Sequence, residues 1–453
     1  MVRGESSGSG VGVRRVVSLA WPIVVTMLSY NVMTLADAVF VGRIGTAALA
    51  AVGLAAVVLH AGYSMGIGLM GGLRVVVARH TGAERHREAS GAGWQVFWIA
   101  GVVGVLTLAV VPLGEPVMRA MGGSDEVLAE GLPYLWVRLL SAPVLFAMFG
   151  FGSWFSGRGD TRTPMVANLV GNVVNIALDP VFIFGLGPVP AMGTAGAAIA
   201  TVLGQCAAVA IYALRGRRDL RVVRPSIDGP VLREVWRLGA PIGVRQLLEV
   251  SSWGLFASAL AQAGEAHLAA HVLVVRIICV SFLPGLAVSE AAGILVGQAM
   301  GAGRLEEARQ AWWVSTWLAV ILMVAGGILF VAVPEVLVRP FGVEPDVVDI
   351  AVDLLWIAAG FQVFDAVATV ALGAINGAGD TRFSMVLSIG SAWLVKVPVA
   401  LWLALPMGLG AVGAWLGLTA ELVVLSVIAV WRIRSGRWLG DVSRLAGELS
   451  IAR

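Results

Sequence analysis

One short stretch of this chain occurs twice, and its recurrence limits the possible folds more than any other feature. The sequence GRGDT at 157–161 returns as GAGDT at 377–381, an offset of 377 − 157 = 220 residues. Each copy ends one long apolar run and begins another. Glycine supplies the left-handed backbone that ends a helix, and Asp or Thr can cap the next one. Each copy therefore predicts a polar turn between two membrane helices.

Three further pairs of stretches share nearly the same offset, 219 residues. They are WPI at 21–23 with API at 240–242, LAA at 49–51 with LAA at 268–270, and GAER at 82–85 with GAGR at 301–304. Internal repeats of this length are a recurrent feature of transporters. The chain is predicted to consist of two homologous halves joined near 215–233, and we divide it into domains 1–220 and 221–453.

The composition indicates a protein that crosses a membrane many times. Of the 453 residues, 58% are hydrophobic and 13% are charged, with a mean hydropathy of +0.88. The net charge of +3 and the placement of basic residues at loop ends argue against nucleic-acid binding. Residues 1–12 form a short Gly/Ser-rich polar tail without the layout of a signal peptide.

A helix needs about 20 residues to cross the hydrocarbon core. Twelve apolar runs are long enough: 16–40, 47–73, 92–113, 127–152, 163–185, 192–214, 234–260, 268–297, 311–333, 347–373, 383–405 and 408–431. Six runs per half is an even number, so both halves enter the membrane from the same side. The predicted fold is an all-α polytopic membrane protein of twelve transmembrane helices, in two six-helix bundles related as parallel repeats.

Arginine is concentrated in alternate loops and in the C-terminal tail. On the rich side lie Arg74, Arg79, Arg85, Arg87, Arg158, Arg162, Arg215, Arg217, Arg218, Arg221, Arg224, Arg233, Arg237, Arg304, Arg309, Arg382, Arg432, Arg434, Arg437 and Arg444. The opposite loops hold Arg43, Arg119 and Arg339. The positive-inside rule therefore predicts a cell-membrane protein with both termini in the cytoplasm.

Acids inside apolar runs are the strongest functional candidates, because each costs about 2.5–3.5 kcal/mol at a helix centre. In the first half, Asp37 lies in the first run. Asn175 and Asp179 are one turn apart on a single face of the fifth run, and Pro180 beside them predicts a bend. Thr201 in the sixth run adds a hydroxyl. Two acids close together could exchange a proton near neutral pH. The alternative is that both lie hydrated at helix ends.

The second half does not repeat these acids but has its own. Glu249 and Asp365 are candidates for a second cation or substrate site. Arg245, one turn before Glu249, leaves a simple salt bridge as an equal alternative for that acid. Glu290 could pair with Arg276 or Lys396 across helices, which sequence does not decide.

The sequence predicts no metal site and no enzyme. His267 and His271 have a spacing that can hold a metal, but LAA between them lacks the Glu that a zinc-protease helix uses as general base. A polar pair at a helix end is the favoured interpretation. No nucleophile with a neighbouring base is evident.

Several motifs in order resemble the multidrug and toxic compound extrusion (MATE) family over nearly the whole chain. They are WPI through DAVFVGRIG at 21–45, the two GxGDT turns, NxxxDP at 175–180, GAAIAT at 196–201 and VGQxxGAG at 296–303. The resemblance implies two six-helix bundles around a central cleft. It also implies export of cationic or amphipathic compounds in exchange for protons or sodium.

The matching residues favour one branch of the family. Asp37, Asn175, Asp179 and Thr201 resemble the proton site of the DinF-like branch, whereas Glu249 and Asp365 match the carboxylates of the NorM-like branch. We favour the DinF-like interpretation: a proton-coupled antiporter, with sodium as the alternative ion and no cofactor. We expect it to work as a monomer in the lipid bilayer. The rivals are a lipid-linked-sugar flippase of the same superfamily and, from another class, a membrane-embedded enzyme.

Overall fold

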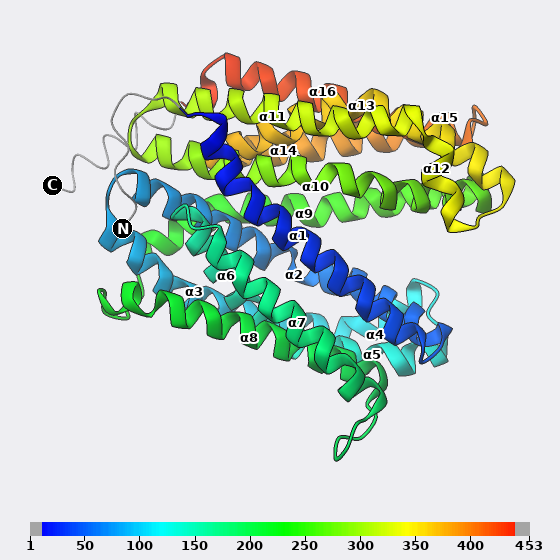
Figure 1. The fold of residues 1–453 in the computed structure, drawn as a ribbon, viewed down its shortest axis with the longest axis horizontal. Coiled ribbons are helices and arrows are strands. Elements are labelled where there is room, and N and C mark those ends of the chain that lie inside the picture. The colour runs from blue at the N-terminus through cyan, green and yellow to red at the C-terminus, as the bar shows by residue number, and fades with distance from the viewer. Residues whose placement is uncertain (1–10, 440–453) are drawn as a thin grey trace. The chain divides into compact units, whose positions relative to one another are not determined.

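The structure is a computed structural model that describes residues 11–439, and this part of the chain is entirely helical apart from its connections (Figure 1). The longer elements are α1 Val13–Gly42, α2 Thr46–Gly82, α3 His86–Thr107, α4 Val111–Ala120, α5 Asp125–Leu140, α6 Ala142–Gly157, α7 Arg162–Phe184, α8 Gly193–Arg221, α9 Gly229–Ala263, α10 Glu265–Gly301, α11 Leu305–Ala332, α12 Pro334–Val338, α13 Pro345–Gly377, α14 Thr381–Ser391, α15 Val397–Ala404 and α16 Gly410–Arg434. Most of the polar tail predicted at 1–12, and Arg444, lie outside the described residues.

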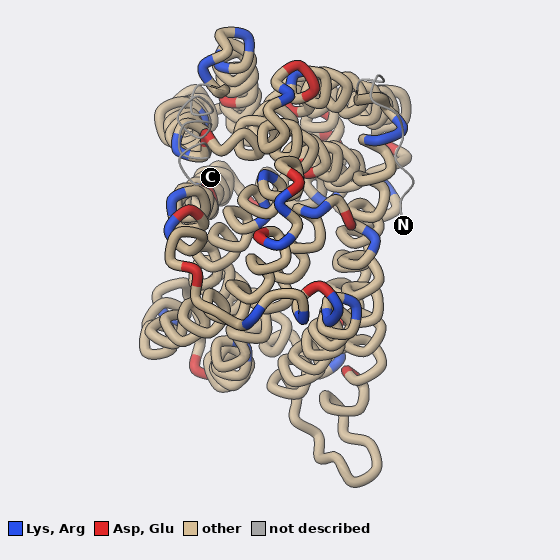
Figure 2. The backbone as a smooth tube through the Cα atoms, turned by 90° about the vertical axis from the view of Figure 1, so that its left-hand side faces the viewer, with Lys and Arg blue, Asp and Glu red and all other residues tan. Residues whose placement is uncertain are grey.

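Each of the twelve predicted runs coincides with a helix or a helix pair, so the all-α polytopic fold is confirmed. Ten helical segments of the described range are long and apolar enough to span a membrane, and the bent pair α5 and α6 makes an eleventh. The twelfth run lies in α9, which is long enough but carries Arg233, Glu234, Arg237, Arg245 and Glu249. Most of the chain is uncharged, as the tan tube shows (Figure 2).

Three of the predicted runs are not plain α-helices. The run 127–152 bends by 53° where α5 meets α6. A single 3₁₀ turn, Leu108–Val110, separates α3 from α4, and a π-helical turn, Ala392–Lys396, separates α14 from α15. By contrast, α7 continues through Pro180 to Phe184. The helix is therefore not broken at Pro180, which lies in its last turns, and the predicted bend stays a prediction.

The helices form two compact units. One comprises Pro22–Leu247, and the other comprises Leu248–Arg453 together with Met1–Trp21. Each has its own apolar core. Phe146, Phe151, Trp154 and Tyr212 are fully buried in the first, and Trp415 is fully buried in the second. The domain boundary at 220/221 divides the sequence repeat and stays a prediction.

The two copies of the repeated turn have the same backbone. Gly159 and Gly379 both have φ +85°, a conformation that favours glycine. The backbone N–H of Asp160 donates to Phe155 O at 3.0 Å, and that of Asp380 donates to Ile375 O at 3.1 Å. The repeat is thus structural as well as sequential.

The acids of these turns nevertheless have different partners. Asp160 caps α7 as predicted, accepting from Thr163 N at 2.9 Å. Asp380 instead pairs with Arg432 at the end of α16 at 2.8 Å. In the first copy the corresponding link runs the other way, from Arg158 to Asp219 at the end of α8 at 2.7 Å. Both turns are therefore tied by an ion pair to the last helix of their half.

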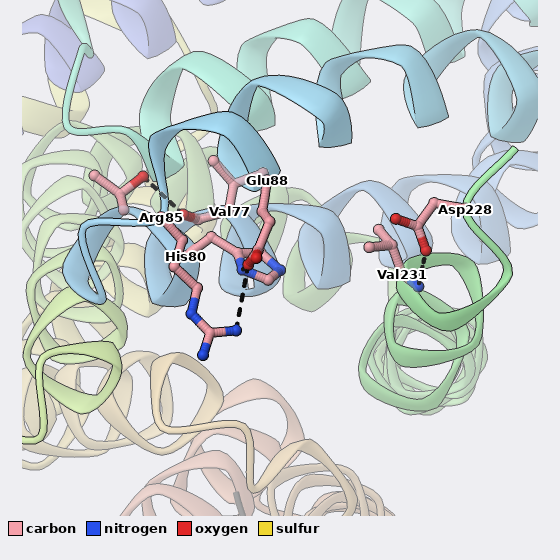
Figure 3. A network of polar contacts seen from close by, with 7 residues as sticks. Val77, His80, Arg85, Glu88, Asp228 and Val231 are labelled. Carbon is pink, nitrogen blue, oxygen red and sulfur yellow. Dashed lines mark hydrogen bonds and ion pairs between the residues drawn. The ribbon is translucent and has the colours of Figure 1, made fainter. Parts of the chain in front are cut away.

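The turn after α2 repeats after α10. Glu84, with φ +59°, stands where the second half has Gly303, with φ +70°. Arg85 then pairs with Glu88 at 3.4 Å, as Arg304 pairs with Glu307 at 3.2 Å. Figure 3 shows Arg85 converging on Glu88, whose carboxylate also contacts the His80 ring (Figure 3).

The arginine-rich loops of the unit Pro22–Leu247 meet at one end of it. Arg79 at the end of α2 pairs with Glu234 near the start of α9 at 3.2 Å. Trp94 Nε1 donates to Leu220 O at 3.1 Å, which ties α3 to the end of α8. Figure 3 also shows Asp228 capping α9. Successive helices run in opposite directions and so bring these loops together. The distribution of arginine predicted that these loops of the first half lie on one side.

Candidate ion-coupling site

The four candidate residues of the first half lie together in one unit, on three helices. Asp37 is on α1, Asn175 and Asp179 are on α7, and Thr201 is on α8. Their contact depends on a close approach of α7 and α8.

Two glycines, one on each helix, permit this approach. A Cβ added to Gly171 would lie 2.7 Å from Gly204 O, and one added to Gly204 would lie 2.5 Å from Gly171 O. Asn175 lies one turn beyond Gly171, and Asp179 one turn further on the same face. Backbone contact at the glycines thus brings this polar face of α7 against α8.

Asn175 is the centre of the cluster. With both of its polar atoms satisfied, its Nδ2 donates to Asp37 Oδ1 at 3.0 Å and its Oδ1 accepts from Thr201 N at 3.2 Å. With the amide turned over, Nδ2 lies 3.4 Å from both Asp179 Oδ1 and Thr201 Oγ1. The amide therefore contacts its three predicted neighbours and fixes their spacing. The Thr201 hydroxyl itself donates to Ala197 O at 2.9 Å.

The two acids face each other within hydrogen-bonding reach. Asp179 is fully buried and Asp37 is half-buried. Among the described residues, Asp179 Oδ2 has no hydrogen-bond donor. Two ionised carboxylates can only accept, so this contact lacks a proton unless one of the pair carries it.

A basic residue beside this cluster was missed by sequence reasoning. Arg138 on α5 lies within electrostatic range of Asp37 and of Tyr134. In the described structure its buried Nε and Nη1 atoms have no hydrogen-bond partner. The signal was present, because Arg138 is a basic residue inside the apolar run 127–152, as unusual there as an acid.

The second-half candidates do not form a comparable cluster. Asp365 on α13 is half-buried and accepts from Thr369 Oγ1 at 3.1 Å. Glu249 on α9 is exposed, and within residues 11–439 no hydrogen bond or ion pair joins it to Asp365. The salt bridge considered between Arg245 and Glu249 is also absent from this range, and Arg245 Nε has no partner.

The two histidines of α10 accept hydrogen bonds from α16. His267 Nδ1 accepts from the Ala411 N–H, and His271 Nδ1 accepts from Trp415 Nε1, both at 3.2 Å. The two histidines are one turn apart on α10, and their two donors are one turn apart on α16. The two bonds therefore join α10 and α16 in register. These bonds agree with the favoured interpretation of a polar pair, which stays a prediction, and His271 is buried.

The profile of the MatE family matches the chain twice, over residues 22–181 and 241–402. The chain belongs to the MatE family. The two matches start 241 − 22 = 219 residues apart, which is the offset of the repeated stretches. This membership confirms the resemblance inferred from the motifs. Because the family consists of transporters, it also confirms that this MatE protein is not an enzyme.

Curated relatives of this MatE protein cover nearly all of its length. One is a probable multidrug resistance protein NorM of Pseudomonas putida, 30% identical, covering 92% of this chain and 94% of the relative. A probable multidrug resistance protein NorM of Thermotoga maritima is 29% identical, covering 94% and 93%.

Solved structures show the same fold at low identity. A crystal structure of MATE in the bent conformation is 24% identical with a TM-score of 0.86, covering 95% of this chain and 97% of that one. A MOP superfamily transporter from Pyrococcus furiosus is also 24% identical with a TM-score of 0.86, covering 97% and 100%. The DinF-like branch assignment stays a prediction.

Proposed function

We propose that this MatE protein exports small cationic or amphipathic organic molecules by alternating access, driven by proton antiport through Asp37 and Asp179. The names of the relatives support the multidrug substrate class. The two acids in contact, one of them fully buried without a donor at Oδ2, are the observation that supports proton coupling.

Protons would change the charge of this cluster in steps. Asp37, Asp179 and Arg138 together carry −1 with both acids ionised, 0 with one proton and +1 with two. A cationic substrate is therefore attracted before proton uptake and repelled after it. Asn175 and Thr201 position the acids so that the charges act at one place. This order of events gives exchange rather than leakage.

Sodium is the alternative coupling ion. Carboxylate, amide and hydroxyl oxygens are all hard ligands, so the cluster also offers groups that a small cation accepts. Imposing each ion gradient separately on the same vesicles distinguishes the two. We further propose that the protein is a monomer in the cell membrane. Both termini are proposed to lie in the cytoplasm, since arginine-rich loops meet at one end of the unit Pro22–Leu247.

A lipid-linked-sugar flippase is the second candidate, and Arg138 is the observation that favours it. A guanidinium whose buried Nε and Nη1 have no partner among the described residues could bind a phosphate. Against it, the same neighbourhood holds two acids. Replacing Arg138 by Gln removes a positive charge and should therefore lower the Kd for a cationic dye if the protein is a cation exporter. It should abolish translocation of a fluorescent lipid phosphate if the protein is a flippase.

The deciding experiment measures uptake of a fluorescent cation into inside-out vesicles under an imposed proton or sodium gradient. Proton-driven uptake by the wild type, lost in Asp37→Asn and Asp179→Asn, supports the proposal. Uptake at the wild-type rate by both variants would refute the assigned site, and sodium-driven uptake alone would refute proton coupling.

A further inference from the structure

The unit that contains Leu248–Arg453 holds a second buried charge cluster that the proposed proton site does not use. The ammonium of Lys396 lies 3.3 Å from Glu421 Oε2 and 4.5 Å from the centre of the Trp253 ring. Lys396 is 2% exposed and Glu421 is 8% exposed. Lys396 is the only lysine in the sequence. The sequence left open whether Lys396 pairs with Glu290; in the structure Lys396 pairs with Glu421.

Local backbone features place these side chains. Lys396 ends the π-helical turn Ala392–Lys396, and Pro398 follows in the first turn of α15. On the facing helix, a Cβ added to Gly417 would lie 2.6 Å from Ala400 N, so α15 and α16 touch at backbone distance there. Glu421 lies one turn after Gly417, which brings its carboxylate to the lysine.

The groups around the ammonium are those that recognise an organic cation. An aromatic face beside a carboxylate attracts a positive charge of low hydration, and burial strengthens the attraction. Unlike Lys396 and Glu421, Trp253 is 36% exposed. Glu249, one turn before Trp253 on α9, is an exposed second acid within electrostatic range of Glu421. The cluster thus holds two acids and a single ammonium.

We propose that Lys396 is a tethered competitor that occupies, between Glu421 and Trp253, a binding site for the cationic group of a transported compound. The inference rests on the proposed function in one respect, the cationic class of the substrate. An incoming cation must displace the ammonium, so Lys396 weakens cation binding and favours release.

The test is calorimetric titration of the detergent-purified full chain with tetraphenylphosphonium, and with uncharged triphenylphosphine oxide as control. Lys396→Met should lower Kd for the cation about tenfold or more and leave that for the neutral compound unchanged. Lys396→Met with Glu421→Gln should lose this gain. An unchanged or raised Kd for the cation in Lys396→Met would overturn the proposal. Equal tightening for both compounds would also overturn it, because that result indicates only added space.

Removing Lys396 leaves a buried carboxylate unpaired, which costs stability. If Lys396→Met does not fold, Lys396→Gln, whose amide can still donate to Glu421, is titrated in its place. Lys396→Ala gives a second readout, because n-propylammonium should raise its Tm whereas n-propanol should not. No rise with the amine would count against the site.

The outcome is separable from that of the proposed function. Wild-type export with an unchanged Kd in Lys396→Met would reject the competitor alone. A tightened Kd without any export would reject the exporter and keep the cation site.

Discussion

Asp179→Asn is the substitution that most directly tests proton coupling. Asp179 is fully buried and lies within hydrogen-bonding reach of Asp37, and its Oδ2 has no donor among the described residues. An asparagine amide of the same shape supplies that donor and so imitates the proton-loaded pair. We therefore expect the variant to fold as well as the wild type but to be unable to release its proton equivalent. Its ion-driven export should be lost.

The size of the effect follows from the number of protons. Exchange of one proton for a monovalent cation moves no net charge, so only the pH difference drives it, at about 1.4 kcal/mol or tenfold accumulation per pH unit. Across about two pH units the wild type should accumulate dye up to about 100-fold. A second proton would square that ratio and add about 2.3 kcal/mol per 100 mV. Asp179→Asn should give no accumulation.

The assay is dye accumulation in liposomes at a clamped membrane potential, with the pH difference varied. Asp353→Asn, which makes the same acid-to-amide change at an exposed position of α13, is the matched control and should accumulate dye like the wild type. Accumulation by folded Asp179→Asn that still rises with the pH difference would refute the assignment of the site to this pair.

Three further predictions concern the turns, the packing and the second half. Glu84→Gly should raise the free energy of unfolding by about 1 kcal/mol by removing a left-handed non-glycine residue, and Gly303→Ala should lower it similarly; thermal melts in detergent that rank them otherwise refute the argument. Gly72→Ala places a Cβ 2.6 Å from a backbone atom and should lower the free energy of unfolding by about 2–3 kcal/mol. Gly101→Ala, whose Cβ meets nothing within 4 Å, is the control, and equal melting points for the two variants would contradict the argument. Asp365→Asn should weaken export of a quaternary-ammonium dye more than that of an uncharged amphiphile while proton dependence persists, and equal losses would exclude a substrate role.

The sequence by itself determined the membrane spans, the repeat and the faces of single helices. Hydropathy locates spans because each must satisfy its backbone internally and present apolar side chains to lipid. The shared offset located turns that have the same backbone at Gly159 and Gly379. Helical spacing placed Asn175 and Asp179 on one face. All of these are local properties.

Contacts between helices were decided only by the tertiary structure. Asp37 lies 179 − 37 = 142 residues before Asp179, and their contact depends on the rotation of α1 and on the glycine contact between α7 and α8. For Lys396, the choice of Glu421 over Glu290 follows from the π turn and the backbone contact of α15 with α16. Because lipid and the protein interior are equally apolar, hydropathy says almost nothing about how a helix is rotated or how deep it lies. Packing between helices therefore decides which buried charges meet.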